Sequence, residues 1–401
     1  MIGRAEGDNR RVTTSLRPLL VGLLLLTLAT ALTPAGATAA RPSRSGPAAQ
    51  AAARAPSAAA RPTARRARLP KARHVFVINI ENKGFARTLG PDSQAPYLAS
   101  TLRSKGVLLT QYYGAAHVSQ GNYIAQVSGQ GPNVETQSDC QVFTELVSVE
   151  TVAPGQAVGA GCVYPGRVRT IGNQLTRRHL RWKGYMQDMD TDCQHPQLNR
   201  VDGSQSATVG HQYAARHNPF IYFHSIIDRP AYCARHVVKL NRLRADLRRA
   251  RTTPNLAYIT PDLCEDGHDA PCVDGRPGGL ASVNAFMRRW VPRILRSPAF
   301  RKDGVLIITA DESDGPQSDA TACCGETAVN TPAAGITGPG GGRIGALVIS
   351  RWTKPGSVST TPYNHYSLLK SMEMVFGLSY LGYAGSRGLR AFGTDVYHRP
   401  R

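Results

Sequence analysis

Acidic and amide side chains follow three separate apolar runs of the chain. In chain order they are Glu81 and Asn82 after residues 74–80, Asp262 and Asp266 after 256–260, and Asp311 and Glu312 after 304–310. One such group would be explained by the preference of Asp and Asn for turns. Three groups that meet at one edge of a sheet would repel one another and resist ionisation, and a bound divalent cation relieves that repulsion. The pattern therefore predicts a metal site.

The predicted ligands are oxygen donors, which favours a hard cation such as Ca²⁺, Mg²⁺ or Mn²⁺. His268 lies in the acidic segment after the second run, and His365 precedes a helical pattern. Either imidazole would shift the preference toward zinc or iron. The residue types thus predict a divalent metal ion and leave its identity open.

A candidate nucleophile lies in the segment 117–123, which reads HVSQGNY. The segment precedes a predicted helix of small residues, so Ser119 is expected near a helix N-terminus, where free N–H groups and the helix dipole attract anions. A hydroxyl beside a metal loses its proton more easily and can attack phosphorus, and Asn122 could donate to a phosphate oxygen. Serine is also a common helix N-cap, so the spacing alone leaves both interpretations open.

Nearly continuous apolar runs predict the buried strands of a parallel sheet. They cover residues 74–80, 256–260, 304–310 and 344–350, with shorter candidates at 182–187 and 220–223. Helical patterns cover 95–105, 237–250, 282–295 and 366–376, and the segments 130–180 and 312–343 are irregular. Strands that alternate with helices predict an α/β fold with a mostly parallel central sheet sandwiched by helices.

The first 73 residues predict export followed by a spacer. Basic residues, the apolar stretch 19–32 and the small residues that follow are typical of a secretory signal peptide spanning residues 1–39. Residues 40–73 are rich in Ala, Pro and Arg and contain no acid, so we expect a disordered linker. Its basic part, 41–73, is either simply solvated or in loose electrostatic contact with an anionic envelope. We expect a secreted protein whose folded domain spans 74–401, and the oligomeric state stays open.

The net charge of +21 is unevenly distributed. Residues 1–73 hold 13 basic and two acidic residues, so about half of the excess lies outside the predicted domain. This distribution weakens the interpretation as a specific nucleic-acid-binding protein, as does the scarcity of aromatic residues for base stacking. A non-catalytic, basic envelope- or nucleic-acid-binding protein is the alternative from a different class, and it leaves Glu81, Asp311 and Glu312 unexplained.

The eight cysteines fit an oxidising destination, where disulfides are the default. Proximity favours the pairs Cys140–Cys162, Cys193–Cys233 and Cys264–Cys272. The adjacent residues at 323 and 324 could pair with each other, bind a metal, or displace the other pairings. A bridge between 264 and 272 would clamp the loop that carries Asp266 and His268.

Five short segments occur in a recognisable order: 80–82 (IEN), 117–123 (HVSQGNY), 261–269 (PDLCEDGHD), 309–312 (TADE) and 364–367 (NHYS). Together they resemble motifs of the secreted bacterial phosphoesterases of the acid phosphatase and phospholipase C type, within the alkaline phosphatase superfamily. Val118 and Gly121 stand where that family often has prolines, which puts the substrate range in doubt rather than the reaction class.

The resemblance implies an alkaline-phosphatase-like fold and a role for each matched residue. The implied metal ligands are Glu81, Asn82, Asp311 and Glu312. Ser119 is implied to be a nucleophile that is transiently phosphorylated. The implied groups that hold phosphate or protonate the leaving oxygen are His117, Asn122, His268 and His365, with Asp262 and Asp266 as further candidates.

Two substrate classes fit these motifs. A phosphomonoesterase needs a pocket that grips three terminal oxygens, whereas a phospholipase C acting on a phosphodiester needs an apolar groove for diacylglycerol. The basic segment 237–250 could approach a phospholipid surface or form a solvated face. We favour monoester hydrolysis, with the phospholipase as the alternative, and a third possibility retains the fold without activity. The remaining histidines are assigned to packing or to the surface: His74, His179, His195, His211, His217, His224, His236 and His398.

Overall fold

The computed structural model describes residues 70–398, except for the side chains of residues 148 and 149. The predicted signal peptide and residues 40–69 of the predicted linker lie outside the described residues. The last linker residues already pack against the domain, since Ala72 is buried and the Arg73 N–H donates to the carbonyl of Asp303 at 3.2 Å. Among the described residues, no helix has the length and apolar character needed to cross a membrane.

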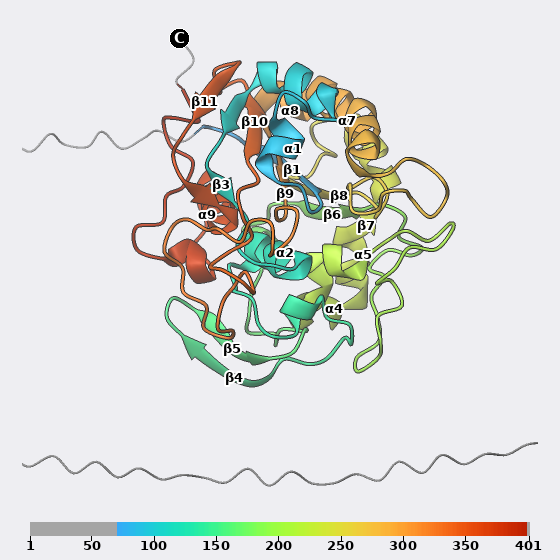
Figure 1. Ribbon diagram of the computed structural model, residues 1–401, viewed down its shortest axis with the longest axis vertical. Helices are drawn as coiled ribbons and strands as arrows, with labels where there is room; N and C mark the ends of the chain where they lie inside the picture. The colour runs from blue at the N-terminus through green and yellow to red at the C-terminus, as the bar shows by residue number, and fades with distance from the viewer. Residues whose placement is uncertain (1–69, 399–401) are drawn as a thin grey trace, which may run out of the picture. The chain divides into compact units, whose positions relative to one another are not determined.

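An eight-stranded sheet organises the domain, in the order β11-β2-β10-β9-β1-β8-β6-β7 (Figure 1). Its central strand β1 (His74–Ile80) pairs in parallel with β8 (Leu256–Thr260) on one side and with β9 (Gly304–Ala310) on the other. All side chains of these three strands are buried, as expected for a sheet that is covered on both faces. Beyond β8, the strands β6 (Trp182–Met186) and β7 (Val237–Lys239) continue the parallel arrangement.

The other edge of the sheet contains its antiparallel pairs. β10 (Ala346–Ser350) runs antiparallel to β9 and to β2 (Val107–Leu109), and β11 (Ser357–Ser359) runs parallel to β2. Five of the seven strand pairings are therefore parallel, which confirms the predicted mostly parallel α/β sheet.

Helices cover both faces of the sheet. In Figure 1, α7 (Gly279–Arg296) and α8 (Pro298–Asp303) lie above the central strands, and α2 (Ser119–Ser128) and α5 (Pro230–His236) lie below them. The remaining helical elements are α1 (Phe85–Leu89), η1 (Tyr97–Leu102), η2 (Arg103–Lys105), η3 (Thr136–Ser138), α3 (Ile171–Arg177), η4 (Ala215–His217), η5 (Pro219–Tyr222), α4 (His224–Ile227), η6 (Leu240–Arg242), α6 (Leu243–Asp246), α9 (His365–Phe376) and η7 (Gly382–Gly385). Two small sheets pair β3 (Tyr112–Tyr113) with β12 (Tyr363–Asn364) and β4 (Val147–Val152) with β5 (Gln156–Ala160).

Most predicted elements are confirmed. The strands at 74–80, 256–260 and 304–310 have the predicted bounds, and those at 182–187 and 344–350 are shorter by one and two residues. The helix predicted at 366–376 ends at Gly377, whose φ of +66° is a left-handed helix stop that glycine adopts without strain. The segment 312–343 contains no named element, whereas 130–180 contains the β4–β5 hairpin and α3.

Two predicted elements are wrong. Residues 220–223 are predicted as a strand, but Pro219 begins the 3₁₀ helix η5 and Phe220 packs against Trp182, with ring centroids 4.7 Å apart. A short apolar run does not by itself distinguish a strand from a helical turn. The single helix predicted at 237–250 is divided among β7, η6 and α6, because Val237 and Val238 pair with β6 at the edge of the sheet.

Candidate active site

The three predicted acidic segments meet at the carboxyl ends of β1, β8 and β9. The N–H of Asp311 donates to the carbonyl of Ile80 at 3.0 Å, and the N–H of Asn82 donates to Asp311 Oδ1 at 2.9 Å. The segment after β8 joins them, because the N–H of Glu81 donates to the carbonyl of Asp266 at 2.9 Å. The parallel pairing of the strands therefore brings these distant segments together at one edge of the sheet.

Ser119 is the first residue of α2, and its hydroxyl points into this cluster. Ser119 Oγ donates to Glu81 Oε2 at 2.8 Å, and the hydroxyl of Tyr123, one helical turn further on, donates to Glu81 Oε1 at 2.6 Å. The N-cap of α2 is Val118, which makes no side-chain capping bond. The hydroxyl of Ser119 is thus bonded to a carboxylate of the cluster rather than used to cap the helix.

Burial and mutual repulsion destabilise the charged forms of these carboxyl groups. Burial raises the pKa of Glu81 well above its usual value, and the nearby charges of Asp311 and Asp266 raise it further. Burial likewise raises the pKa of Asp311 and the pKa of Glu312. These carboxyl groups therefore favour their protonated forms, and a bound cation would offset the charge of their ionised forms.

Some buried side-chain oxygens of the centre lack hydrogen-bond partners. Asn82 Oδ1 and Asp311 Oδ2 are buried and have no hydrogen-bond partner within residues 70–398. Glu312 Oε2 is also buried, and His117 Nδ1 lies 2.5 Å from it. A buried oxygen without a partner is costly, so such oxygens are candidates for binding a ligand. With Glu81, these residues make up the donor set predicted from the sequence, and their oxygen atoms are of the kind that divalent cations bind.

His217 belongs to this centre, although it was assigned to packing or the surface. Its Nε2 lies 3.3 Å from Glu81 Oε1, and its Nδ1 lies 3.1 Å from Asp266 Oδ2. Ligand atoms of Glu81, His217 and Asp266 all lie within 4.8 Å of one another, a spacing that could hold a metal ion. The His217 ring also stacks on Tyr123, with centroids 5.3 Å apart.

Arg216 is a second residue that the sequence analysis missed. It is 3% exposed, its Nη2 lies 3.2 Å from His268 Nε2, and its Nε lies 3.4 Å from Asp139 Oδ2. Asp139 also accepts a bond from the N–H of Gln120, in the first turn of α2. A buried guanidinium is therefore held close to the helix end that carries Ser119. The only sequence signal for Arg216 and His217 is that they form, with Asn218, a polar triplet inside an otherwise apolar segment.

Two of the three histidines implied to hold phosphate or protonate the leaving oxygen differ in their exposure to solvent. His117 is buried, with Nδ1 2.5 Å from Glu312 Oε2 and Nε2 3.0 Å from the carbonyl of Asp319. His268 is partly open to solvent, and its Nδ1 lies 2.8 Å from Asp269 Oδ1. Burial lowers the pKa of both imidazoles, and the charge of Arg216 lowers that of His268 further.

Three other predicted site residues have different partners. Asn122 bonds only to backbone groups of residues 115–118, with its Oδ1 accepting from the N–H groups of Ala115 and Ala116. His365 is fully buried between the Tyr112 hydroxyl, 3.1 Å away, and the carbonyl of Asp311, 2.5 Å away. Asp262 accepts from the N–H of Glu265 at 2.8 Å, which shapes the turn after β8. In this structure these side chains position the loops around the centre.

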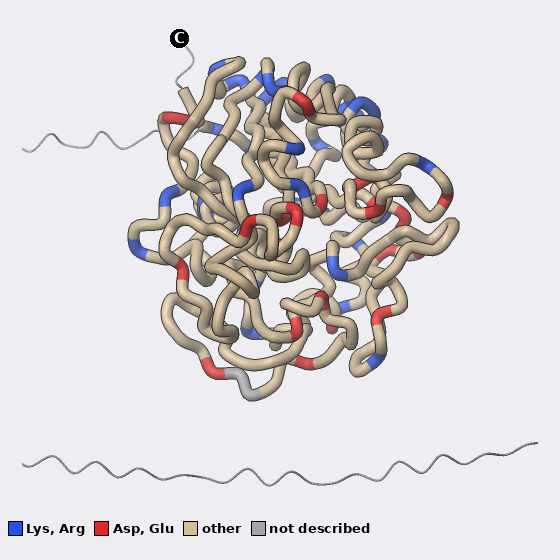
Figure 2. The backbone as a smooth tube through the Cα atoms, viewed as in Figure 1, with Lys and Arg blue, Asp and Glu red and all other residues tan. Residues whose placement is uncertain are grey.

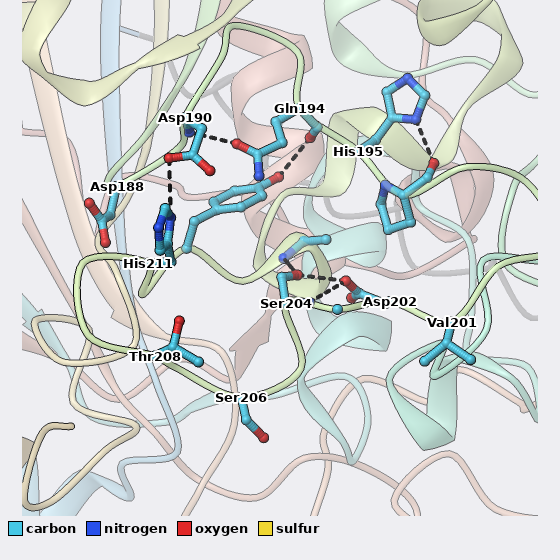
Figure 3. A pocket seen from close by; sticks show the side chains of 14 residues that line it. Asp188, Asp190, Gln194, His195, Val201, Asp202, Ser204, Ser206, Thr208 and His211 are labelled. Carbon is cyan, nitrogen blue, oxygen red and sulfur yellow. Dashed lines mark hydrogen bonds and ion pairs between the residues drawn. The ribbon is translucent and has the colours of Figure 1, made fainter.

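A polar hollow of about 370 Å³ is lined in part by the segment of chain that leads to Arg216 and His217 (Figure 3). Asp202, Ser204 and Ala215 line the hollow, and the next two residues along the chain, Arg216 and His217, belong to the centre. Three carboxylates and two imidazoles surround this space, from Asp188, Asp190, Asp202, His195 and His211.

Four disulfides are present among the described residues: Cys140–Cys162, Cys193–Cys233, Cys264–Cys272 and Cys323–Cys324. The three pairs favoured by proximity are confirmed, and the two adjacent cysteines pair with each other. The bridge between 264 and 272 closes the loop that carries Asp266 and His268, as expected.

The fold and the site define an α/β protein with a serine hydroxyl set among buried carboxylates, the kind of centre used in metal-assisted ester hydrolysis. The chain belongs to the phosphoesterase family, whose model matches residues 91–379. The resemblance inferred from the five sequence motifs is thereby confirmed.

The chain is similar to several curated phosphatases. It is 24% identical to a phosphate-repressible acid phosphatase of Penicillium chrysogenum over 71% of this chain and 55% of the relative. It is 23% identical to an acid phosphatase of Aspergillus fumigatus, over 73% and 53% respectively. The chain thus spans about half the length of these fungal relatives. It is 21% identical to a phosphatidylinositol-3-phosphatase of Mycobacterium tuberculosis, over 79% of this chain and 81% of the relative.

Solved structures give a more distant likeness. A protein in the alkaline phosphatase superfamily from Vibrio parahaemolyticus aligns with a TM-score of 0.42 and 12% identity, over 78% of this chain and 69% of that one. A sulfatase from Pseudoalteromonas sp. aligns with the same TM-score and identity, over 79% and 70%.

Proposed function

We propose that this protein is a secreted, metal-dependent phosphoesterase that hydrolyses phosphate monoesters through a phosphoserine intermediate. The observation that carries the proposal is the 2.8 Å hydrogen bond from Ser119 Oγ to Glu81 Oε2, inside a cluster of buried oxygens that lack partners. Membership of the phosphoesterase family supports the reaction class.

Ser119 acts as the nucleophile in this proposal. Its proton moves to Glu81 Oε2 along the existing hydrogen bond while Oγ attacks the phosphorus atom, and it returns to Oγ when water cleaves the phosphoserine. Tyr123 holds the other carboxylate oxygen of Glu81 and so keeps the acceptor aligned. When bound by Glu81, Asn82, Asp311 and Glu312, a divalent cation would favour the deprotonated hydroxyl and offset charge on the phosphoryl group.

The cationic and neutral donors around Ser119 bind the phosphate oxygens. Arg216 supplies a guanidinium beside the N-terminal turn of α2, whereas both ring nitrogens of His117 already contact Glu312 and the Asp319 carbonyl. Gln120 adds a buried amide whose nitrogen and oxygen have no partner within residues 70–398. His268, at the solvent-exposed edge, protonates the leaving oxygen when it carries a proton, and its neutral form then takes a proton from the water that attacks the phosphoserine.

Monoester hydrolysis is favoured over the phospholipase C reaction by the polar hollow. Its carboxylates, imidazoles and hydroxyls suit a polar leaving group, whereas diacylglycerol requires an apolar groove. The phosphatases to which the chain is similar support the same choice, and one of them is a phosphatidylinositol-3-phosphatase. A monoester on a lipid headgroup is therefore within the proposed substrate class.

Export is supported by the predicted signal peptide and by the four disulfides. The absence of free cysteines among the described residues fits an oxidising destination.

Turnover of p-nitrophenyl phosphate and of bis(p-nitrophenyl) phosphate tests the proposal. The wild type should hydrolyse the monoester faster, and a chelator should abolish the activity until metal is restored. Ser119→Ala should be inactive, whereas Ser128→Ala, which removes a buried hydroxyl from the other end of the same helix, should retain activity. An inactive wild type would support the non-catalytic alternatives, and faster diester hydrolysis would support the phospholipase.

A further inference from the structure

A hollow of about 360 Å³ between α6 and the C-terminal part of α7 is lined mainly by arginines. Four of its seven lining residues are Arg244, Arg248, Arg293 and Arg296. We call this space the arginine hollow. It shares no lining residue with the polar hollow and no residue with the candidate active site. Figure 2 shows Lys and Arg gathered along α7 at the upper right of the view.

These four arginines lack acidic partners, unlike their neighbours. Arg289 pairs with Glu265, and Arg242 pairs with Asp192. Within residues 70–398, by contrast, none of the four guanidiniums of the arginine hollow forms an ion pair, and no carboxylate lines the space. Four like charges around one space repel one another, so an anion placed there would be bound favourably.

Trp290 fixes the arrangement of two of these side chains. The guanidinium carbons of Arg244 and Arg293 lie 5.7 Å and 5.6 Å from the centroid of its ring. Trp290 is buried, and its Nε1, which can only donate, has no acceptor among the described residues. Stacked guanidiniums lose less freedom when they bind, and their planar forks match phosphate oxygens.

The dipole of helix α7 explains the position of only two of the four arginines. Arg293 and Arg296 lie in the last turn of α7, where cations stabilise the helix dipole. Arg244 and Arg248 come from a different segment, in and just after α6, and face the same space. The dipole therefore does not account for the convergence of the four side chains.

We propose that the arginine hollow is a second binding site, separate from the active site, for a multiply charged phosphate group. A guanidinium can bind a phosphate group through two parallel hydrogen bonds. Four guanidiniums around one space match a dianionic or more highly charged phosphate group better than a singly charged diester. The phosphate could belong to a soluble polyanion or to a phosphomonoester lipid headgroup. The proposal concerns binding alone and does not depend on the catalytic activity.

The test uses the full-length protein, inorganic pyrophosphate as a soluble probe, and vesicles of phosphatidylcholine with and without phosphatidic acid. Calorimetric titration with pyrophosphate should show a binding component that Arg248→Gln/Arg296→Gln weakens by about tenfold or more, because charge-assisted hydrogen bonds are lost. Arg387→Gln/Arg390→Gln is the matched control. It removes the same charge from exposed arginines of another segment and should leave the affinity within about twofold of wild type.

The two vesicle preparations identify the source of the phosphate. Co-flotation of the wild type with phosphatidic acid vesicles, lost in Arg248→Gln/Arg296→Gln, assigns the site to a lipid headgroup. Pyrophosphate binding without co-flotation assigns it to a soluble anion. Equal pyrophosphate affinity in the wild type and both variants, or no binding component outside the active site together with no co-flotation, would overturn the proposal.

Discussion

Ser119 Oγ and Glu81 Oε2 lie 2.8 Å apart, although 37 residues separate them in the chain. Glu81 is placed by the end of β1, and Ser119 is placed by the start of α2. The bond joins the predicted nucleophile to one of the predicted metal ligands. The proposed catalytic mechanism depends on this bond.

Metal binding should depend on pH, because it requires carboxylates in their ionised form. Burial raises the pKa of Glu81, of Asp311 and of Glu312, so the metal must displace protons that these groups otherwise keep. The apparent affinity should therefore fall as the pH is lowered, by up to about tenfold per unit for each proton displaced. Titration of the metal-free protein at several pH values, with proton release followed in weak buffer, measures this. An affinity that does not change with pH would contradict the assignment of these ligands.

Removing one ligand should reduce the metal content more than the stability of the fold. In Asp311→Asn, one charged oxygen is lost while the side-chain acceptor for the Asn82 N–H is kept. We expect metal affinity to fall about 10-fold to 100-fold or more. Metal analysis of the purified variant checks the prediction, with Asp395→Asn, which alters a carboxylate outside the centre that bonds to Tyr363, as the control. Equal loss of metal in both variants would point to an indirect effect.

His217 should act by positioning Glu81. It lies between Glu81 and Asp266 and stacks on Tyr123, so His217→Phe keeps the ring packing and removes both nitrogens. We expect a reduction of kcat by about 10-fold to 100-fold with a small change in KM, because the substrate contacts are retained. His217→Asn, which keeps a nitrogen donor, serves as the second variant. Wild-type kcat in both would show that the centre does not need this residue.

Much of this centre could be predicted from the sequence, because the strands that carry it are uniform apolar runs. β1, β8 and β9 are recognisable from their composition, and the residues after them are placed by the rule that parallel strands end at one edge. Arg216 and His217 could not be placed in this way. They lie in η4, between irregular segments, and only tertiary packing brings them to Glu81.

One of the two misassigned elements shows how pairing in the sheet overrides a helical sequence pattern. The segment 237–250 has a helical pattern, yet two valines at its start complete the edge of the sheet, and the rest is too short to form one helix. Tertiary pairing thus outweighed local preference. The same break brings Arg244 and Arg248 alongside α7, an arrangement that no periodicity in the sequence indicates.

Glu373 predicts a second pH effect, on stability rather than on activity. This carboxyl group of α9 is fully buried and accepts from the Leu381 N–H at 2.9 Å, and burial raises its pKa to about 9. In the unfolded chain its pKa is about 4.3. Between these two pKa values, Glu373 is protonated in the folded state and ionised in the unfolded state. The protonated carboxyl group therefore stabilises the fold at low pH, and this stabilisation is lost as the pH rises toward about 9.

Glu373→Gln should remove this dependence, because glutamine stays neutral and keeps an acceptor for Leu381. The variant should gain stability relative to wild type as the pH is raised from about 5 to about 8, by up to about 4 kcal/mol. Urea unfolding of both proteins at the two pH values measures the difference. A stability difference that does not change with pH would show that Glu373 is ionised in the folded state.

The Cys264–Cys272 disulfide should support substrate binding as well as stability. It closes the loop that carries Asp266 and His268, and a loop of this length contributes about 2.5 kcal/mol in the chain-entropy model. Cys264→Ser/Cys272→Ser should therefore lower the melting temperature and raise KM, because His268 is held less firmly. Cys193→Ser/Cys233→Ser is the control that removes a disulfide joining other segments, and it should lower the melting temperature without raising KM. A KM increase of the same size in both variants would contradict the local role.

The most direct measurement is the detection of phosphate on Ser119 during turnover. The wild type, quenched in acid while it hydrolyses p-nitrophenyl phosphate, should yield a peptide phosphorylated at Ser119 in mass spectrometry, and Ser119→Ala should yield no phosphorylated peptide and no turnover. Turnover that persists in Ser119→Ala, or phosphate found only on another residue, would contradict the account.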